Sequence, residues 1–362
     1  MFINTQNKYI WKNGSFESWD HSNVHILSHT LHYGTGVFEG VRAYKTKDGA
    51  AIFRLIDHTQ RLFNAASRIG IKIPFSQSEI NQAQCDTLNK NNLNEGYIRP
   101  IVYLGNEGLG LRAKDLSVNV AIASWEWPSY MDPEAKKNGI SVIKSSHRQY
   151  ENPLHSGNKI IGTYFSNTMA LHEALDNGAD EAVMLDKNDF ISEGSGENIF
   201  IVKDQSIFAP TTEHCLNGIT RQSVIQIAQD LKFQVYEKDI SYEDLLNADE
   251  AFFTGTAVEI TPISKLDNKM IANGKITAAF ADKRIANALK LKVKQFTVQI
   301  GAKTHTVKAA KDGEFDRTSK DAIVKLARKG ERITISNIRA TSPKYPKKTF
   351  IPINVVSLTV QD

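Results

Sequence analysis

The chain has 362 residues, of which 41% are hydrophobic and 23% charged, so it can build sizeable cores. Its net charge of +4 is small beside 44 Lys and Arg and 40 Asp and Glu residues, which argues against a dedicated nucleic-acid surface. No apolar run is long enough for a transmembrane helix, the N-terminus lacks the pattern of a signal peptide, and Cys85 and Cys215 form no metal motif or disulfide framework. We therefore expect a soluble cytoplasmic protein without nucleic-acid or membrane partners.

The first 127 residues have the patterns of a small α/β domain. A hairpin is predicted at 9–16, with Asn13-Gly14 as its two-residue turn. Apolar spacing predicts a helix over 56–69, with Asp57 as its N-cap. Branched and aromatic residues predict strands at 50–55, 97–104 and 118–125.

A second and a third part follow this domain. Residues 128–138 contain two prolines and are predicted to be an interdomain linker, and residues 139–290 are predicted to form a larger α/β domain. Its strands are predicted at 140–144, 181–186, 198–203, 206–209, 235–239 and 250–254, and its helices at 163–177, 220–231 and 276–289. Residues 291–362 are predicted to form an appended small β-rich module, with strands at 296–300, 332–338 and 354–360 around one helix at 319–327.

Three side chains of the large domain carry the groups that a pyridoxal phosphate ring needs. Lys159 supplies an amine for the imine, Tyr164 a phenol for the ring hydroxyl, and Glu193 a carboxylate that keeps the ring nitrogen protonated. The apolar residues after Lys159 are expected to desolvate its amine and lower its pKa. The alternative for Lys159 is a solvated lysine at the start of a helix, and the alternative for Glu193 is a loop carboxylate without a special role. Glu197 competes with Glu193 within the same glycine-punctuated motif.

Several segments could bind anions. Arg61 on the predicted helix could reach a phosphate or lie in solvent, and residues 218–221 open a helix whose N-terminus has free N–H groups. The turn at 255–257 follows a strand in the same way.

Four histidines show metal-like spacing, at His21, His25, His29 and His32. No cysteine or carboxylate completes that set, so local hydrogen bonding is the favoured interpretation and no metal site is predicted.

With these residues assembled, the chain resembles a branched-chain amino acid aminotransferase of the fold-type IV pyridoxal phosphate enzymes, from about Tyr9 to Leu289. The motifs that carry the resemblance are residues 29–42, Arg61-Leu62, 97–100, Lys159, 193–200, 216–221 and 255–262. The resemblance implies a two-domain α/β or α+β fold, with a small α/β domain and a larger pseudo-barrel domain. It also implies a homodimer or a higher homo-oligomer.

The resemblance also implies roles for individual residues. Lys159 is the Schiff-base lysine and the proton shuttle, Glu193 pairs with the ring nitrogen, and Tyr164 bonds the ring oxygen. The other implied cofactor residues are Leu216, which packs on the ring, and the phosphate ligands Arg61, Ile219, Thr220 and Thr256. The implied substrate residues are Tyr97, Thr256 and Ala257 for the α-carboxylate, Arg99 for the side-chain carboxylate of glutamate, and Tyr33, Phe38, Gly40 and Leu111 as pocket walls. Tyr33 and Leu111 are expected from the partner subunit.

The implied reaction moves the amino group between Leu, Ile or Val and 2-oxoglutarate. D-amino acid aminotransferases and aminodeoxychorismate lyases use the same cofactor apparatus, but the Tyr97-x-Arg99 pair and residues 38–42 favour the branched-chain members. The alternative from another class is a non-enzymatic scaffold that acts through its C-terminal module. Residues 291–362 weakly resemble the C-terminal β domain of the gliding-motility and type IX secretion protein GldM, and they could bind a protein partner.

Overall fold

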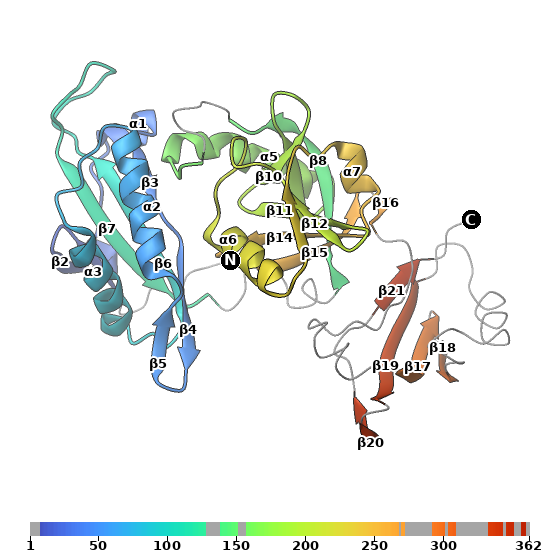
Figure 1. Cartoon of the computed structure of the whole chain (residues 1–362). Coiled ribbons are helices and arrows are strands. Elements are labelled where there is room, and N and C mark those ends of the chain that lie inside the picture. The colour runs from blue at the N-terminus through green and yellow to red at the C-terminus, as the bar shows by residue number, and fades with distance from the viewer. Residues whose placement is uncertain are drawn as a thin grey trace. The chain divides into compact units, whose positions relative to one another are not determined.

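A computed structural model of the chain describes residues 8–127, 138–150, 157–267 and 269–271, and the backbone of five strands beyond residue 291 (Figure 1). The chain separates into two compact units, one of residues 1–136 and 140–271 and one of residues 137–139 and 272–362. The linker predicted at 128–138 and the helices predicted at 276–289 and 319–327 lie largely or wholly outside the described residues.

The first sheet of the larger unit has seven antiparallel strands in the order β2-β1-β7-β6-β4-β5, and β3 also pairs with β6. The strands are β1 (Tyr9–Lys12), β2 (Ser15–Ser18), β3 (Gly36–Phe38), β4 (Val41–Thr46), β5 (Gly49–Ile52), β6 (Gly96–Leu104) and β7 (Val118–Trp125). Lys12 pairs with Ser15, so the predicted Asn13-Gly14 turn is confirmed, and both of its residues have positive φ.

Two helices pack against this sheet, α2 (Leu55–Arg68) and α3 (Gln77–Lys90). Their apolar faces share a core with strand residues such as Val37, Ile98 and Ile122. The prediction of Asp57 as N-cap is wrong, because Arg54 is the N-cap in a left-handed conformation and Asp57 instead accepts from Arg54 Nε at 2.6 Å. Helix α3 was not predicted, although Ser76 and Glu79 form a capping box at its start.

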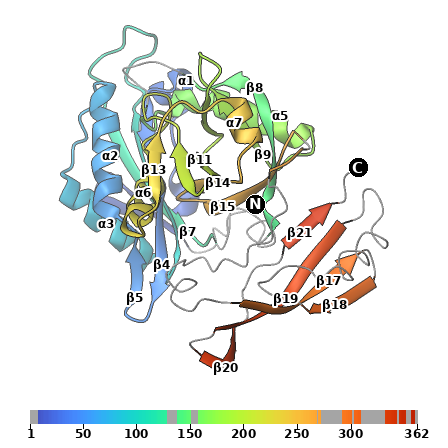
Figure 2. The same ribbon diagram turned by 45° about the vertical axis from the view of Figure 1, so that its right-hand side comes forward.

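The second sheet has nine strands in the order β10-β9-β8-β15-β14-β11-β12-β13, with β16 paired to β15, and it is strongly curved (Figure 2). The strands are β8 (Ile140–Arg148), β9 (Glu181–Leu185), β10 (Ile191–Gly194), β11 (Asn198–Lys203), β12 (Ser206–Ala209), β13 (Gln234–Glu237), β14 (Glu250–Gly255), β15 (Glu259–Leu266) and β16 (Lys269–Met270). Three pairs are parallel, β8 with β9, β8 with β15, and β12 with β13.

Helices connect and cover these strands. They are α5 (Tyr164–Asp176), α6 (Ile219–Asp230) and α7 (Tyr242–Leu246). The helices predicted at 163–177 and 220–231 therefore match α5 and α6 to within one residue at each end. The described part of the unit also contains the short helices η1 (Trp19–His21), α1 (His29–Tyr33) and η2 (Ile161–Thr163). No helix in the described part of the chain is long and apolar enough to cross a membrane.

The smaller unit contains an antiparallel sheet in the order β18-β17-β19-β20, and β21 also pairs with β19. Its strands are β17 (Lys292–Ile300), β18 (Lys303–Lys308), β19 (Arg332–Ser342), β20 (Tyr345–Phe350) and β21 (Val356–Thr359). The three strands predicted in this part fall on β17, β19 and β21.

Candidate active site

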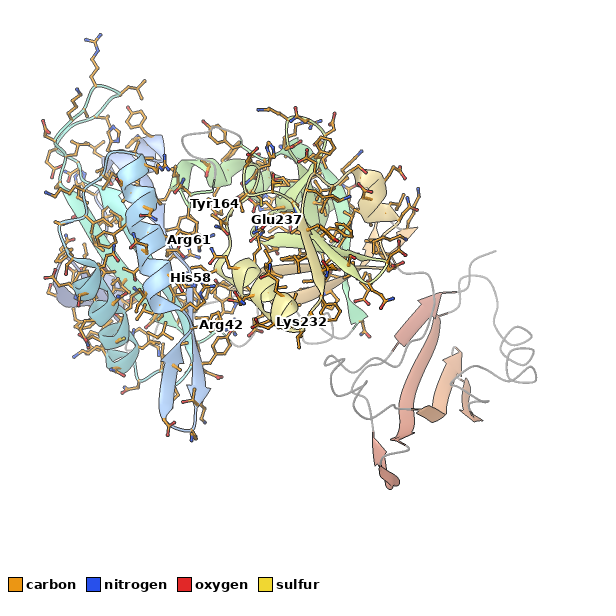
Figure 3. The ribbon with its side chains drawn as sticks, in the orientation of Figure 1. Arg42, His58, Arg61, Tyr164, Lys232 and Glu237 are labelled. Atoms are coloured by element: carbon orange, nitrogen blue, oxygen red, sulfur yellow. The ribbon has the colours of Figure 1, made fainter. Side chains whose placement is uncertain are left out.

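A cavity that is partly open to solvent lies between the two sheets of the larger unit. All of the side chains predicted to bind a cofactor line it, namely Arg61, Lys159, Tyr164, Glu193, Leu216, Ile219, Thr220 and Thr256. They come from helices, from one strand and from the connections around them. Figure 3 shows Arg61 of α2 and Tyr164 of α5 reaching into the space between the sheets. The fold therefore brings together residues that are far apart in the sequence.

Lys159 lies just before η2 and is held from both sides. Its backbone carbonyl accepts from the N–H of Phe38 at 3.1 Å, and its Nζ donates to the hydroxyl of Tyr164 at 2.7 Å. Burial and the nearby Arg61 lower the pKa of Lys159, but Tyr164 and Glu39 more than offset both, so the net pKa is raised. The expectation of a lowered pKa is therefore wrong, because burial acts in the predicted direction but is outweighed by these neighbours together.

Glu193 lies on β10, opposite Met184 of β9, and its side chain is buried. Gln149 donates to Oε1 at 2.5 Å, while the N–H of Leu216 and the amide of Asn198 donate to Oε2 at 3.1 and 3.2 Å. Burial raises the pKa of Glu193 to about 7, against the lowering effects of these donors and of nearby cations. The carboxyl group is therefore balanced between its two charge states near neutral pH.

Glu197, the competing carboxylate, also lines the cavity but has different surroundings. It accepts from the N–H of Gly196, and it lies against Glu181, which is fully buried. Burial and the charge of Glu181 raise the pKa of Glu197 well above its ordinary value. Burial and the neighbouring carboxylate therefore both favour the protonated form of Glu197. Glu193, with three donors, is better suited than Glu197 to carry a negative charge.

Positive groups for an anion gather at the other end of the cavity. Helix α6 begins at Ile219 with Gly218 as its N-cap, and no side chain caps that end. Its first N–H groups and the positive end of its dipole are therefore available to an anion beside Ile219 and Thr220. Arg61 of α2 reaches the same region and donates from Nη1 to the carbonyl of Asn217 at 3.2 Å.

Glu39 holds Arg61 and is itself bonded to His58, and neither Glu39 nor His58 had a predicted role. Glu39, which is 1% exposed, accepts from Arg61 Nε at 2.5 Å and Nη2 at 2.9 Å. His58, one helical turn before Arg61 on α2, lies 2.8 Å from the same carboxylate through Nδ1. Burial raises the pKa of Glu39, but Arg61 and His58 outweigh it and hold that pKa well below its usual range. The i, i+3 spacing of His58 and Arg61 was the signal available in the sequence.

The residues predicted to bind substrate divide into three groups. Gly40, Tyr97, Thr256 and Ala257 line the cavity itself. A β-carbon on Gly40 would lie 1.8 Å from the Tyr97 hydroxyl, so only glycine allows this tyrosine its position. Arg42, another residue without a predicted role, donates to the carbonyl of Ala257 at 3.3 Å and so helps to hold the 255–257 turn.

Phe38 and Arg99 adjoin the cavity lining. The ring of Phe38 lies 4.8 Å from the ring of Tyr164, and the guanidinium of Arg99 lies 4.9 Å from Phe38 and 5.5 Å from Tyr97, measured to the ring centroids. The Nε atom of Arg99 is buried and has no hydrogen-bond partner among the described residues. A buried donor of this kind can serve an incoming carboxylate.

Tyr33 and Leu111 do not line the cavity of their own chain. Leu111 is 87% exposed and Tyr33 is 38% exposed, and other apolar side chains near them are also exposed, including Ile26, Leu31 and Leu109. Three of the four histidines make the predicted local hydrogen bonds, namely His25 with Leu27, His29 with Thr35 and His32 with Ile26. His29 also lies within hydrogen-bond distance of Gly110, 81 positions away. No metal-binding group of three or more His, Cys, Asp or Glu is present in the part of the chain that the structure describes.

The amino-transferase class IV family model matches residues 36–266 of this chain. The chain belongs to the class IV aminotransferase family. The branched-chain-amino-acid aminotransferase of Pseudomonas aeruginosa is 49% identical over 267 residues, which cover 74% of this chain and 87% of that protein. The enzyme of the same name from Escherichia coli K12 is 40% identical over 270 residues, with the same two coverages.

Solved structures of this family have the same fold. The Escherichia coli branched-chain amino acid aminotransferase superposes with a TM-score of 0.74 at 39% identity, covering 78% of this chain and 93% of that one. The branched-chain amino acid aminotransferase of the archaeon Thermoproteus uzoniensis, solved with norvaline, gives 0.71 at 38% identity, covering 78% and 93%. Another enzyme of this name was solved in complex with N-(5'-phosphopyridoxyl)-L-glutamate, and it gives 0.72 at 39% identity, covering 79% and 93%. The predicted family, enzyme class and fold-type IV architecture are confirmed.

The residues that line the cavity fit pyridoxal phosphate. The amine of Lys159, hydrogen-bonded to the phenol of Tyr164, matches the aldehyde and the ring oxygen of the cofactor. The buried carboxyl of Glu193, with its three donors, matches the ring nitrogen. Arg61 beside the N-terminus of α6 matches the phosphate. Lys159, Tyr164, Glu193, Arg61 and the first residues of α6 line one cavity, so a single small molecule can contact all of them.

Proposed function

We propose that this chain is a pyridoxal phosphate-dependent branched-chain amino acid aminotransferase. It transfers the amino group between L-leucine, L-isoleucine or L-valine and 2-oxoglutarate, giving branched-chain 2-oxo acids and L-glutamate. The observation that carries the proposal is the pairing of Lys159 Nζ with the Tyr164 hydroxyl in the same cavity as buried Glu193. The 49% identity to a branched-chain-amino-acid aminotransferase supports the substrate class.

Each part of the cofactor has its own residues in this proposal. Lys159 would hold the aldehyde carbon, Tyr164 the ring oxygen and Glu193 the ring nitrogen. The ring would pack on Leu216, and the phosphate would be held by Arg61, Ile219, Thr220 and Thr256. When bound, the cofactor supplies an electron sink that stabilises negative charge on the substrate α-carbon.

The protein contributes the proton transfers and the orientation of the substrate. Once the substrate amine displaces it from the aldehyde carbon, neutral Lys159 Nζ would be the general base that takes the proton from the substrate α-carbon and delivers it to that former aldehyde carbon. Tyr164 fixes the position of this nitrogen through the 2.7 Å hydrogen bond. Ionised Glu193 keeps the proton on the ring nitrogen.

Substrate binding combines one apolar wall with two carboxylate sites. Tyr97, Thr256 and Ala257 bind the α-carboxylate, and Arg42 holds the turn that carries the last two. Arg99 binds the side-chain carboxylate of glutamate. When a branched side chain is bound, the faces of Phe38 and Tyr97 compensate for the missing anion by cation–π contact.

The rest of the apolar wall comes from a partner subunit in this proposal. Phe38 and Gly40 supply one side, and Tyr33 and Leu111 of a second copy supply the other. The exposure of both Tyr33 and Leu111 in a single chain supports a homodimer, or a higher homo-oligomer, with a shared site.

The remaining proposals concern organisation and location. Residues 1–127 form a small domain, 128–138 a linker, 139–290 the large cofactor-binding domain, and 291–362 an appended β-rich module. The enzyme acts in the cytoplasm, in keeping with its unpaired cysteines. The resemblance of the module to the GldM domain stays a prediction, as does a protein partner for it.

Reduction of the holoprotein with borohydride tests the proposed function. We expect one pyridoxyl label, mapped by mass spectrometry to Lys159, and turnover with L-leucine and 2-oxoglutarate. Lys159→Ala should abolish both, whereas Lys144→Ala, a lysine on β8 outside the cavity lining, should retain them. A label elsewhere, or turnover in Lys159→Ala, refutes the role of Lys159 as the lysine that holds the cofactor.

The alternative functions predict other outcomes. Preference for D-amino acids in a panel of both enantiomers would favour a D-amino acid aminotransferase, and loss of pyruvate from aminodeoxychorismate would favour the lyase. A colourless protein without transaminase activity would favour the scaffold.

A further inference from the structure

Gln149 lies directly after β8, next to the carboxyl group of Glu193. Its backbone N–H donates to the carbonyl of Leu185 at 3.0 Å, and its side-chain Nε2 lies 2.5 Å from Glu193 Oε1. Strand β9 lies between β8 and β10 in the sheet, so Gln149 reaches Glu193 across one strand. The two residues are 44 positions apart in the chain, and no local sequence pattern connects them.

The amide of Gln149 has only one orientation that suits an ionised Glu193. A carboxylate can only accept hydrogen bonds, so the amide must present its NH₂ group to it. Its Oε1 atom is then buried and has no hydrogen-bond partner among the residues that the structure describes. An apolar side chain of the same length would avoid the cost of that buried oxygen. The glutamine is therefore favourable at this position only through its donor.

The other neighbours of Glu193 leave Oε1 to Gln149. The N–H of Leu216 and the amide of Asn198 both donate to Oε2. The titratable groups whose charges act on Glu193, or on which its charge acts, are Lys159, Arg61, Glu197 and Cys215. Because burial raises the pKa of Glu193 to about 7, each donor affects how far the group is ionised at neutral pH.

We propose that Gln149 is a positioning residue that holds the Glu193 carboxylate ionised and turned toward the cavity. This inference rests on the proposed function, because Glu193 meets a ring nitrogen only if the chain binds pyridoxal phosphate. Loss of the Gln149 donor favours the protonated form of Glu193, which cannot hold a proton on the ring nitrogen. The ring then withdraws fewer electrons, so the chemical step slows while binding of the substrate carboxylates is unchanged.

Two substitutions separate the donor from the bulk of the side chain. Gln149→Met keeps the length and removes the donor, whereas Gln149→Asn keeps the amide but shortens its reach. Gln82→Met is the matched control, because Gln82 donates to Asp86 at 2.8 Å on α3, outside the cavity lining. Should Gln149→Met fail to fold, Gln149→Asn alone decides the outcome.

The first readout is the ionisation of Glu193 in cofactor-free protein. Infrared difference spectra against Glu193→Gln identify its carboxyl band, which is followed as a function of pH. We expect the midpoint to rise by about one pH unit or more in both Gln149 variants and to stay unchanged in Gln82→Met. Midpoints equal to the wild-type value in both Gln149 variants overturn the proposal.

The second readout uses the holoenzyme. With ¹⁵N-labelled pyridoxal phosphate, the ring nitrogen signal should move toward the unprotonated position in the Gln149 variants, and kcat should fall about tenfold with little change in KM. A raised KM with unchanged kcat and an unmoved nitrogen signal overturns the proposal. If wild-type protein takes up no cofactor, the proposed function fails, but the titration of cofactor-free protein still decides whether Gln149 holds Glu193.

Discussion

Replacing Glu39 by glutamine tests how the cavity balances the charge of Arg61. Glu39 is almost fully buried and accepts two N–H bonds from Arg61, whose side chain is 13% exposed. Burial lowers the pKa of His58, so at neutral pH this histidine is an uncharged partner of the same carboxylate. Glu39 is therefore the counter-ion of Arg61 in the cofactor-free chain. A glutamine side chain at this position would keep the shape but remove the charge.

The expected loss of stability is large because the arginine stays buried. Removing one partner of a buried ion pair costs about 3–5 kcal/mol, since the other charge is left without compensation. Asp57→Asn on the same helix is the control. Asp57 is 50% exposed where it meets Arg54, and an exposed pair of this kind contributes about 0–1 kcal/mol.

Urea unfolding of cofactor-free protein at a mildly alkaline pH measures both effects. Pyridoxal phosphate should then stabilise Glu39→Gln more than it stabilises the wild type, because its phosphate replaces the lost negative charge beside Arg61. A double variant, Glu39→Gln with Arg61→Gln, should recover much of the lost stability, since neither charge remains. If Glu39→Gln unfolds at the same urea concentration as Asp57→Asn, the buried-pair argument is wrong.

Three further predictions concern the cavity and one helix. In cofactor-free protein, Glu193 has a pKa of about 7 when folded and about 4.5 when unfolded, so its contribution to stability falls by about 3 kcal/mol as pH rises from 4.5 to 7. Unfolding at several pH values should show this slope in the wild type and a shallower one in Glu193→Gln, and identical slopes would contradict it. Gly40→Ala should displace the Tyr97 hydroxyl and raise KM for amino acids about 10-fold or more without weakening cofactor binding, as measured by steady-state kinetics and cofactor titration. An unchanged KM would show that Tyr97 does not bind the α-carboxylate. Ser76→Ala should lower the stability of the protein by about 1 kcal/mol through loss of the α3 capping box, and thermal unfolding without a measurable shift would count against that cap.

Local patterns in the sequence were enough to predict several parts of the fold. The Asn13-Gly14 turn, α5 and α6 appear where they were predicted, because turn chemistry and apolar spacing act over a few residues. Helix α3 was not predicted, although the capping box of Ser76 and Glu79 is a local pattern that marks its start. The N-cap at Asp57 was wrong because the side chain of Arg54 competes for that carboxylate.

The chemical groups of the site were also visible in the sequence, through motifs that each contain an amine, a carboxylate or a helix start. Their grouping was not determined by any single motif. Helix α2, strand β10 and the connections before η2 and after β14 bring Arg61, Glu193, Lys159 and Thr256 to one cavity, although these residues lie far apart along the chain.

What the sequence determined by itself was the set of reactive groups and the local elements that carry them, because propensity and spacing depend only on neighbours along the chain. What the tertiary structure decided was the charge of those groups. The pKa of Lys159 is raised by its neighbours although burial alone would lower it. Glu39 bonds to Arg61, His58 to Glu39 and Gln149 to Glu193, and no local sequence pattern connects the two residues of any of these pairs. Charge depends on burial and on atoms a few ångströms away, and folding draws those atoms from distant parts of the chain.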